Sequence, residues 1–394
     1  MRSSTLNFRA VAPLLAGVVL CALASAVAVS MQKGWPIPGE PTESWLGDIV
    51  RMREILYEQQ PRDRPTIWII GGSNALFGTD STVLADRTGY AVRNYALHGG
   101  LHINLLFSQI RGRVRAGDLV LAPIEWEALD RKVYNQFDYN NYLHHLSQSL
   151  NAPIDVIYVL CTSVPLKRWM TGVVHRVSYS VPSVQRWWSV LMGHQYVPYQ
   201  PPNFWKQTTR EQYVTGWRSR TGAEIYSFVA LTPAGDFSFD KPATKEIWEN
   251  KETFVVPSTI RPGGLASLDR WHDYFASIGA KLLVMAPVML DSNSDHLRSR
   301  ETWRRIELWR QEMAKTKAPF HCNPVEATYD RRYRFDTVYH LNAAGAHLRS
   351  EEVAKCVLDF LNGTDVRTRA IDPDEAVNQV EARLATQQFV DVLN

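Results

Sequence analysis

The sequence predicts an α/β fold built around a parallel β-sheet. Two parts of the chain alternate short apolar runs with helical patterns, which is the arrangement of βαβ units. Glycine or polar residues follow most of these runs, at the sheet edge where such folds bind ligands. A long irregular stretch rich in tryptophan and tyrosine separates the two parts. We therefore expect one α/β domain interrupted by an aromatic-rich insertion.

The first apolar run, Thr66–Ile70, leads directly into Gly71, Gly72, Ser73 and Asn74. A β-branched run that stops abruptly at two glycines predicts a buried strand followed by a tight turn. Glycine lets the backbone approach a ligand closely and leaves N–H groups that can point at it. Taken alone, this stretch is equally compatible with a Gly-Ser loop that performs no chemistry.

Two more strands are expected in the first part of the domain. Tyr90–Leu97 ends at a His-Gly-Gly turn, and Leu119–Ile124 ends at Glu125. Apolar residues at helical spacing predict the helices of this part. They are Glu43–Tyr57, a helix after Asn74, and a helix that carries Ile103, Leu106, Ile110 and Val114.

The second part of the domain repeats the alternation. A helix that stops at Gly279 precedes a strand at Lys281–Met289, and a charged helix at Arg298–Lys315 precedes a shorter strand at Phe320–Val325. A final helix is expected at Ala343–Leu361. The following tail has amphipathic character and is interpreted as a surface or partner-binding helix, or as a loosely attached segment.

The first residues of the chain predict export. Arg2 and Arg9 precede Ala10–Val29, an uncharged run long enough to span a bilayer as a helix. Positive charge before the run and a folded domain after it place the body outside the cytoplasm. An uncleaved anchor is the favoured interpretation, and a signal peptide cleaved near Ala24–Ala26 is the alternative. In a Gram-negative cell the body then lies in the periplasm, held at the inner membrane or released from it.

Composition narrows the class of partner. A chain of 394 residues with a net charge of +3 and no basic block does not indicate nucleic-acid binding. No Cys or His spacing typical of a zinc site occurs, and we expect neither a metal nor a cofactor. Cys322 and Cys356 are expected either to pair in an oxidising compartment or to remain buried free thiols.

These observations divide the chain into six regions. They are a transmembrane anchor or signal segment at 1–31, a linker with a helix at 32–63, the first part of the α/β domain at 64–130, the aromatic-rich insertion at 131–260, the second part of the domain at 261–362, and the tail at 363–394. Aromatic faces in the insertion suit stacking on sugar rings or contact with a membrane surface. For most of them, packing within the insertion is the alternative.

A serine on a strand-to-helix turn becomes a nucleophile when a base lies within hydrogen-bond reach and an acceptor orients that base. His340 is the candidate base for Ser73, because it lies just before the final helix among polar and aromatic residues. Asp336, four residues earlier, is the candidate acceptor, since a tight loop or helical turn would place both side chains on one side. The N–H groups of Ser73 and of Gly99 or Gly100 are the expected oxyanion donors.

The SGNH/GDSL hydrolase superfamily has motifs that resemble three in this chain: Gly71-Gly72-Ser73-Asn74, Gly99-Gly100 and Asp336…His340-Leu341-Asn342. With the N-terminal segment and Ala122–Glu127, the chain is most similar to its DltD-like and alginate-acetylation-like branch. The resemblance covers residues 64–130 and 262–361. It implies a flavodoxin-like three-layer α/β/α sandwich with Ser73 as nucleophile, His340 as general base and Asp336 as its orienting acid. It also implies an exported protein that works with a membrane-bound acyltransferase to acylate a polymer.

Two features depart from that superfamily. Its members place the acid three residues before the histidine, whereas Asp336 lies four residues before His340. The Gly-x-Asn-Asp block, whose asparagine completes the oxyanion hole, is absent, and a missing donor costs roughly 3 kcal/mol of transition-state stabilisation. Asn74 is a candidate substitute for that asparagine, and the alternatives are a slow enzyme or a fold that binds without catalysis. Glu125, after the third strand, is interpreted as a structural residue bonded to neighbouring backbone, with substrate contact as the alternative.

Three functions are compatible with the sequence. The first is a membrane-anchored periplasmic serine O-acyltransferase that moves an acetyl group onto an exopolysaccharide or a cell-envelope glycan. The second is a carbohydrate acetylesterase with the same Ser-His-Asp triad, in which water is the acceptor. The third is a non-catalytic scaffold partner of a membrane-bound O-acyltransferase (MBOAT). No motif identifies the polymer, the acyl donor or the oligomeric state.

Overall fold

In the computed structural model, five parallel strands form the central sheet: β1 (Thr66–Ile69), β2 (Ala91–Asn94), β3 (Leu119–Pro123), β4 (Lys281–Met285) and β6 (Phe320–His321). Their spatial order is β2-β1-β3-β4-β6, and every neighbouring pair is parallel. The strands are buried almost throughout, which is why they appear in the sequence as continuous apolar runs. The predicted α/β fold with a parallel sheet is confirmed.

The structure describes residues 45–60, 62–130, 230–237, 256–258, 262–292 and 295–389, together with a few isolated positions. The chain divides into two compact units, and these ranges all belong to the unit made of residues 45–134, 149–152 and 209–394. Most of the predicted anchor at 1–31 and most of the predicted insertion at 131–260 lie outside the described residues. Among the residues that are described, no helix has the length and apolar character needed to cross a membrane.

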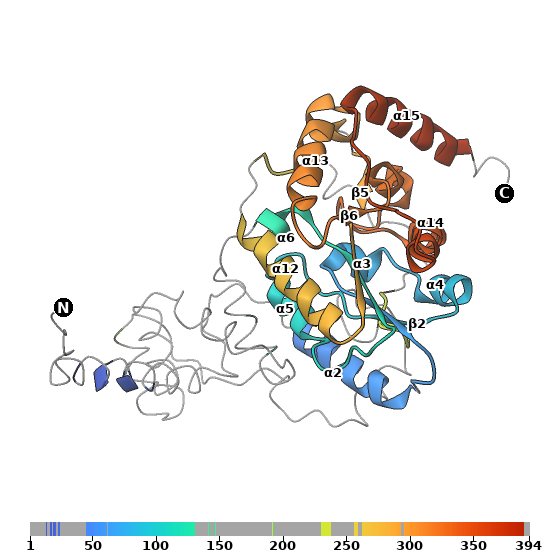
Figure 1. Ribbon diagram of the computed structural model, residues 1–394. Helices are drawn as coiled ribbons and strands as arrows, with labels where there is room; N and C mark the ends of the chain where they lie inside the picture. The colour runs from blue at the N-terminus through green and yellow to red at the C-terminus, as the bar shows by residue number, and fades with distance from the viewer. Residues whose placement is uncertain are drawn as a thin grey trace, which may run out of the picture. The chain divides into compact units, whose positions relative to one another are not determined.

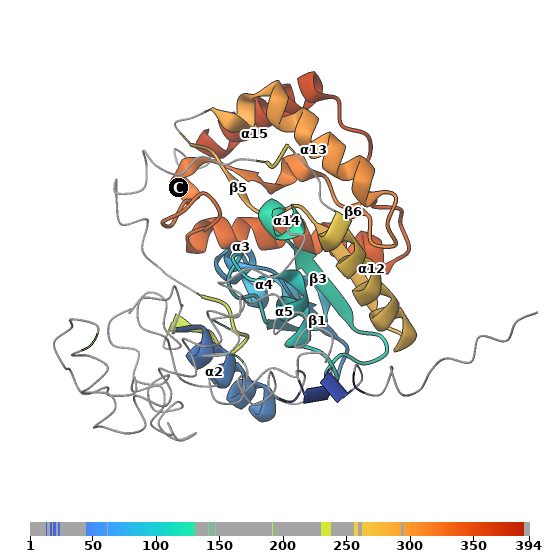
Figure 2. The ribbon, with the colours of Figure 1, turned by 90° about the vertical axis from the view of Figure 1, so that its left-hand side faces the viewer.

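Helices cover both faces of the sheet (Figure 1). On one side lie α5 (Ile103–Ser108), α6 (Trp126–Asp130) and α12 (Pro262–Ser277), and on the other lie α4 (Ser81–Thr88) and α14 (Ala343–Leu361). Phe107 of α5 stacks on Trp271 of α12, with ring centroids 5.4 Å apart. The turned view in Figure 2 shows these two helices beside β1 and β3.

The remaining elements extend this domain. α2 (Trp45–Gln59) precedes β1, and the short helix α3 (Ser73–Phe77) follows it. The C-terminal part adds α13 (Arg300–Met313), α15 (Pro373–Phe389), the paired strands β5 (Met289–Leu290) and β7 (Thr328–Tyr329), and the 3-10 turns η4 (His296–Arg298), η5 (Pro324–Ala327) and η6 (Arg331–Tyr333).

Three strands are several residues shorter than the runs that predicted them. β2 covers Ala91–Asn94 rather than Tyr90–Leu97. β4 ends at Met285 rather than Met289, because Pro287 has no N–H with which to continue the ladder. β6 ends at His321 rather than Val325, because Cys322 adopts the left-handed conformation, with φ of 63°. At the ends of β4 and β6 the local backbone chemistry overrides the hydrophobic pattern.

The C-terminal tail forms a helix that packs on the domain. α15 packs against α13 at the top of both ribbon views (Figures 1 and 2) and buries Ala376, Val380 and Leu384. Arg383 donates to the Thr328 carbonyl (2.9 Å) and to Glu352 Oε2 (2.7 Å). The helical interpretation of the tail therefore agrees with the structure, and the loosely attached alternative does not.

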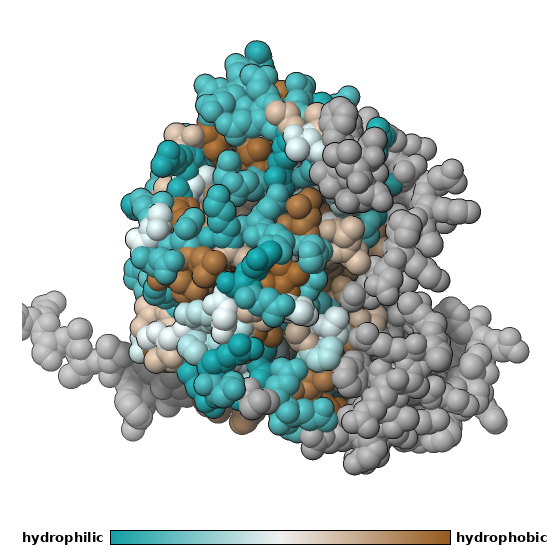
Figure 3. All heavy atoms as spheres, turned by 90° about the vertical axis from the view of Figure 1, so that its right-hand side faces the viewer, coloured by the Kyte–Doolittle hydropathy of each residue, from teal (hydrophilic) through white to brown (hydrophobic). Residues whose placement is uncertain are grey.

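The surface that carries α4 and α14 is mostly hydrophilic, with small separate hydrophobic patches (Figure 3). An exposed ion pair joins the two helices there, with 2.7 Å between Arg87 Nε and Glu351 Oε2. Scattered apolar groups among polar ones are normal for a solvated protein surface, and exposed pairs of this kind add little stability.

Candidate active site

Ser73 begins α3 directly after β1, at the carboxyl edge of the sheet. Because β2 and β3 flank β1 on opposite sides, Ser73 lies where the strand order reverses. In open α/β sheets the crevice at this point is the usual ligand site. Ser73 is partly exposed, and within the described part of the chain neither its hydroxyl nor its N–H is hydrogen-bonded.

Asp336 and His340 lie on a tight loop between η6 and α14. Phe335 N–H donates to the His340 carbonyl (2.8 Å) and Asn342 N–H donates to the Tyr333 carbonyl (2.7 Å), which folds the loop back on itself. The two side chains then meet, with 2.5 Å between His340 Nδ1 and Asp336 Oδ1. When Nδ1 carries the proton that is donated to the carboxylate, Nε2 is left as the basic nitrogen.

The imidazole of His340 lies against α3. It stacks on Phe77, with 4.1 Å between ring centroids and 13° between planes, and is only 4% exposed. Phe77 lies four residues after Ser73 on the same helix face, where such residues are about 5–6 Å apart between Cβ atoms. The structure thus brings the Asp336–His340 pair beside the helix that Ser73 begins. Ser73 and His340 are not hydrogen-bonded to each other.

The turn after β2 lies against the turn that carries Ser73. A Cβ added to Gly72 would come within 2.4 Å of Gly99 Cα, so the two backbones are in direct contact. Gly100 N–H donates to His98 Nδ1 (2.8 Å). Gly99 N–H, by contrast, has no hydrogen bond within the described part of the chain. Of the two glycines proposed as oxyanion donors, Gly99 is therefore the one whose N–H is unengaged there.

The side chain of Asn74 is not available as an oxyanion donor, contrary to the expectation from the sequence. Its side chain is fully buried, with Nδ2 donating to the Pro123 carbonyl (3.1 Å) and Oδ1 accepting from Val288 N–H (3.4 Å). Its backbone N–H is also bonded, to Glu125 Oε1 at 3.1 Å. With its side-chain amide and its backbone N–H hydrogen-bonded in this way, Asn74 fixes α3 to the ends of neighbouring strands.

Glu125 follows β3 and lies against the turn that follows β1. Its carboxylate accepts from Gly72 N–H (3.0 Å) and Asn74 N–H (3.1 Å), and the residue is 3% exposed. These contacts with neighbouring backbone agree with the structural interpretation of Glu125.

Three contributors to the site carry no recognisable motif. Phe77 supports the imidazole, and Tyr339 donates its hydroxyl to Glu127 Oε1 (2.9 Å), which ties the loop of His340 to α6. Arg349 of α14 donates to backbone carbonyls of the α3 turn. Only Arg349 has a signal in the sequence, because it is a charged residue on the apolar face of the final domain helix.

One described segment of the predicted insertion, residues 230–237, also reaches α3. Phe237 N–H donates to the Leu76 carbonyl (3.1 Å), and its ring meets Phe77 edge-on with centroids 5.0 Å apart. Beside it, Asp236 is buried and accepts hydrogen bonds from Ser81 and Asn94. This segment therefore supports the phenyl ring on which His340 stacks.

Asp236 is expected to make the stability of the domain depend on pH. Burial raises the pKa of its carboxyl from 3.8 to about 6, although hydrogen bonds from Ser81 and Asn94 act to lower it. Between these two pH values the folded protein holds a proton that the unfolded chain has released. The contribution to the free energy of unfolding therefore falls by about 3 kcal/mol as pH rises through this window.

Asp236→Asn removes the titrating group, and denaturant unfolding of both proteins between pH 4 and 7 measures its effect. The stability of the wild-type protein relative to the variant should fall as pH rises. Two stability curves that run parallel over this range would contradict the prediction.

Within the described residues, no group of three or more His, Cys, Asp or Glu side chains is arranged to hold a metal ion. Comparisons of the chain with protein-family models, curated proteins and solved structures return no match. The site itself defines the chemistry that it can support. It offers a hydroxyl at a strand-to-helix turn, a base oriented by a carboxylate, and the N–H groups of Ser73 and Gly99.

Proposed function

We propose that this chain is a serine O-acyltransferase that takes an acetyl group onto Ser73 and passes it to a hydroxyl of an exopolysaccharide or envelope glycan. The observation that carries the proposal is the Asp336–His340 pair stacked on the short helix that Ser73 begins. A serine hydroxyl is a weak nucleophile, and an oriented imidazole is the group that activates it. The strand order matches the flavodoxin-like order and supports the resemblance to SGNH hydrolases.

In the first half-reaction, Ser73 Oγ attacks the acyl carbonyl while His340 Nε2 accepts the hydroxyl proton. The N–H groups of Ser73 and Gly99 stabilise the tetrahedral oxyanion. His340 then gives its proton to the leaving group of the donor as the bond to the acyl carbon breaks. Throughout, Asp336 holds the ring and stabilises its cationic form.

In the second half-reaction, a sugar hydroxyl gives its proton to His340 and attacks the acyl-enzyme. The bond between Ser73 Oγ and the acyl carbon breaks, and Ser73 recovers the proton from His340. The sugar leaves as an ester, and the site returns to its starting state. Water in place of the sugar would make the same site an acetylesterase.

The proposed location is the periplasmic side of the inner membrane. The disulfide between Cys322 and Cys356 supports export, since such bonds persist in oxidising compartments. The uncharged run Ala10–Val29 would hold the body at the membrane. A membrane-bound O-acyltransferase is then the proposed partner that supplies the acyl group.

The proposal is tested on the full-length chain in detergent with a fluorophosphonate probe and mass mapping. A covalent adduct is expected on Ser73, because the probe reacts with activated serines. Ser73→Ala should keep its near-ultraviolet circular dichroism and give no adduct. Ser277→Ala, at the exposed end of α12, is the matched control and should be labelled like the wild-type protein.

An activated ester of acetate, offered with and without an oligosaccharide, separates transfer from hydrolysis. Acetyl groups on the sugar support the transferase, and release of acetate alone supports the esterase. A folded wild-type chain that forms no adduct would overturn both enzymatic assignments and favour the scaffold.

A further inference from the structure

The helix α3 is held at both ends by buried charged side chains. Glu125 accepts from N–H groups of its first turn, and Arg349 donates to carbonyl groups of its last turn. We propose that Glu125 and Arg349 are a pair of positioning residues that fix Ser73 for reaction. The proposal rests on the function proposed above and concerns residues that act through the α3 turn rather than on the substrate.

Two glycines make room for the Glu125 carboxylate. A Cβ on Gly72 would lie 2.2 Å from Glu125 Oε1, and one on Gly99 would lie 3.0 Å from Glu125 Cδ. The carboxylate binds the N–H groups of Gly72 and Asn74, which flank Ser73 in the chain. Glu125 thus fixes the turn on both sides of the nucleophile and leaves the Ser73 N–H for an oxyanion.

Arg349 reaches the other end of α3 from the buried face of α14. Its Nη1 donates to the carbonyls of Asn74 (3.2 Å) and Gly78 (3.3 Å), and the residue is buried. A Cβ on Gly78 would lie 2.5 Å from this nitrogen, so the approach requires glycine. Burial lowers the pKa of the Arg349 guanidinium, whereas the charges of Tyr329 and Glu125 act to raise it.

The energetics explain why such a short helix needs both groups. A helix of five residues is not stable by itself in water. Negative charge at its first N–H groups and positive charge at its last carbonyls both match the helix dipole. Burying a charged group is costly unless the group is hydrogen-bonded. Here two buried charged groups both make their hydrogen bonds to one short turn. We infer that the turn must be rigid because it carries Ser73.

The test compares Glu125→Gln and Arg349→Lys with the wild-type full-length chain. The exposed Arg87–Glu351 pair supplies matched controls, Arg87→Lys and Glu351→Gln, which change the same residue types away from the site. The first measurement is the kinetics of fluorophosphonate labelling, resolved into kinact and KI. The second is hydrogen exchange of the backbone at residues 72–78, with residues 81–88 as the internal reference.

In Glu125→Gln, one of the two N–H groups faces an amide nitrogen and loses its acceptor. We expect kinact to fall about 10- to 100-fold, the effect of misplacing a reacting group by about 1 Å, with KI unchanged. Exchange at residues 72–78 should quicken, and exchange at 81–88 should not. A further variant, Arg349→Met, removes the charge. Arg349→Lys keeps the charge and should therefore retain a higher kinact than Arg349→Met. The Glu125→Gln/Arg349→Lys double variant should lose less kinact than the two single variants would lose if their effects were independent, because both residues hold one turn.

Several results would overturn the proposal: wild-type kinact in folded Glu125→Gln protein, unchanged exchange at residues 72–78, or a loss confined to KI. If Arg349→Met does not fold, Glu125→Gln and Arg349→Lys still decide the question. Absence of labelling in the wild-type chain would instead overturn the proposed function. Hydrogen exchange would then still show whether the pair holds the turn.

Discussion

His340→Ala should lower the rate of Ser73 acylation by about 10⁴-fold. The substitution removes the nitrogen that accepts the hydroxyl proton and the ring that stacks on Phe77. The rate constant for covalent labelling of Ser73 measures the loss directly. Because His340 lies in the loop just before α14 and outside the central sheet, we expect the variant to fold and its near-ultraviolet circular dichroism to be retained.

The matched control for this substitution is His347→Ala. His347 lies in α14, its side chain is 59% exposed, and its contact with Asp80 is a surface pair. It should be labelled at the wild-type rate. Asp336→Asn should cost about 10³- to 10⁴-fold, since an amide no longer holds the imidazole in the productive tautomer. Equal labelling of the His340 and His347 variants would contradict the assignment of His340 as the base.

Replacing both Cys322 and Cys356 by serine should lower the free energy of unfolding by about 4 kcal/mol, because the disulfide restricts the unfolded chain. The bond closes a loop across a sequence separation of 34 residues and joins the end of β6 to α14. For a unit of this size the loss corresponds to a fall in Tm of roughly 7 °C. Denaturant unfolding under oxidising conditions measures it.

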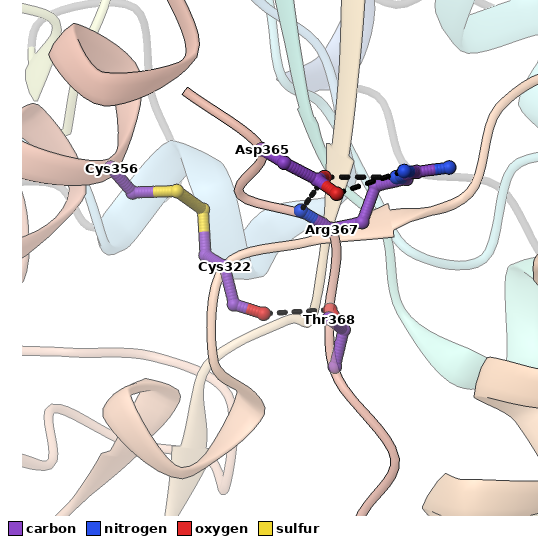
Figure 4. The surroundings of a disulfide bond; sticks show 5 residues. All are labelled: Cys322, Cys356, Asp365, Arg367 and Thr368. Atoms are coloured by element: carbon purple, nitrogen blue, oxygen red, sulfur yellow. Dashed lines mark hydrogen bonds and ion pairs between the residues drawn. A yellow bond between two sulfur atoms is a disulfide. The ribbon is translucent and has the colours of Figure 1, made fainter.

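The same disulfide holds the chain that leaves α14 (Figure 4). Cys322 N–H donates to the Val366 carbonyl (2.8 Å), and Thr368 Oγ1 donates to the Cys322 carbonyl (2.6 Å). Asp365 and Arg367 pair with each other beside these bonds. The reduced wild-type protein should therefore match the double variant. Identical denaturation midpoints for the oxidised and reduced wild-type proteins would contradict this account.

The strands and helices of the fold could be predicted because the sequence patterns that indicate them are local. Runs such as Thr66–Ile69 are apolar on both faces, and a buried parallel strand requires that pattern. Asp336 and His340 could be singled out for a similar reason, since four residues and one tight loop connect them. The extra length predicted for β4 arose because hydrophobicity alone does not register the missing N–H of Pro287.

The contacts that organise α3 were not predictable in this way. Glu125 meets Gly72, Arg349 meets Gly78, and Phe77 meets His340 only after distant segments have packed together. The same holds for Asn74, which looks like an oxyanion donor in the sequence but is bonded to strand ends in the fold. A local pattern names the polar residues of a turn, whereas their partners are determined by tertiary structure.

The division of the domain into two parts has a consequence for biosynthesis. Ser73 and the half-sheet β2-β1-β3 are made before residue 131, whereas β4, β6, Asp336 and His340 are made after residue 280. Until β4 emerges, β3 presents an unpaired backbone edge that must be protected from aggregation. A nascent chain therefore carries Ser73, the proposed nucleophile, long before His340, its proposed base, and the proposed reaction with acyl esters requires both parts of the domain.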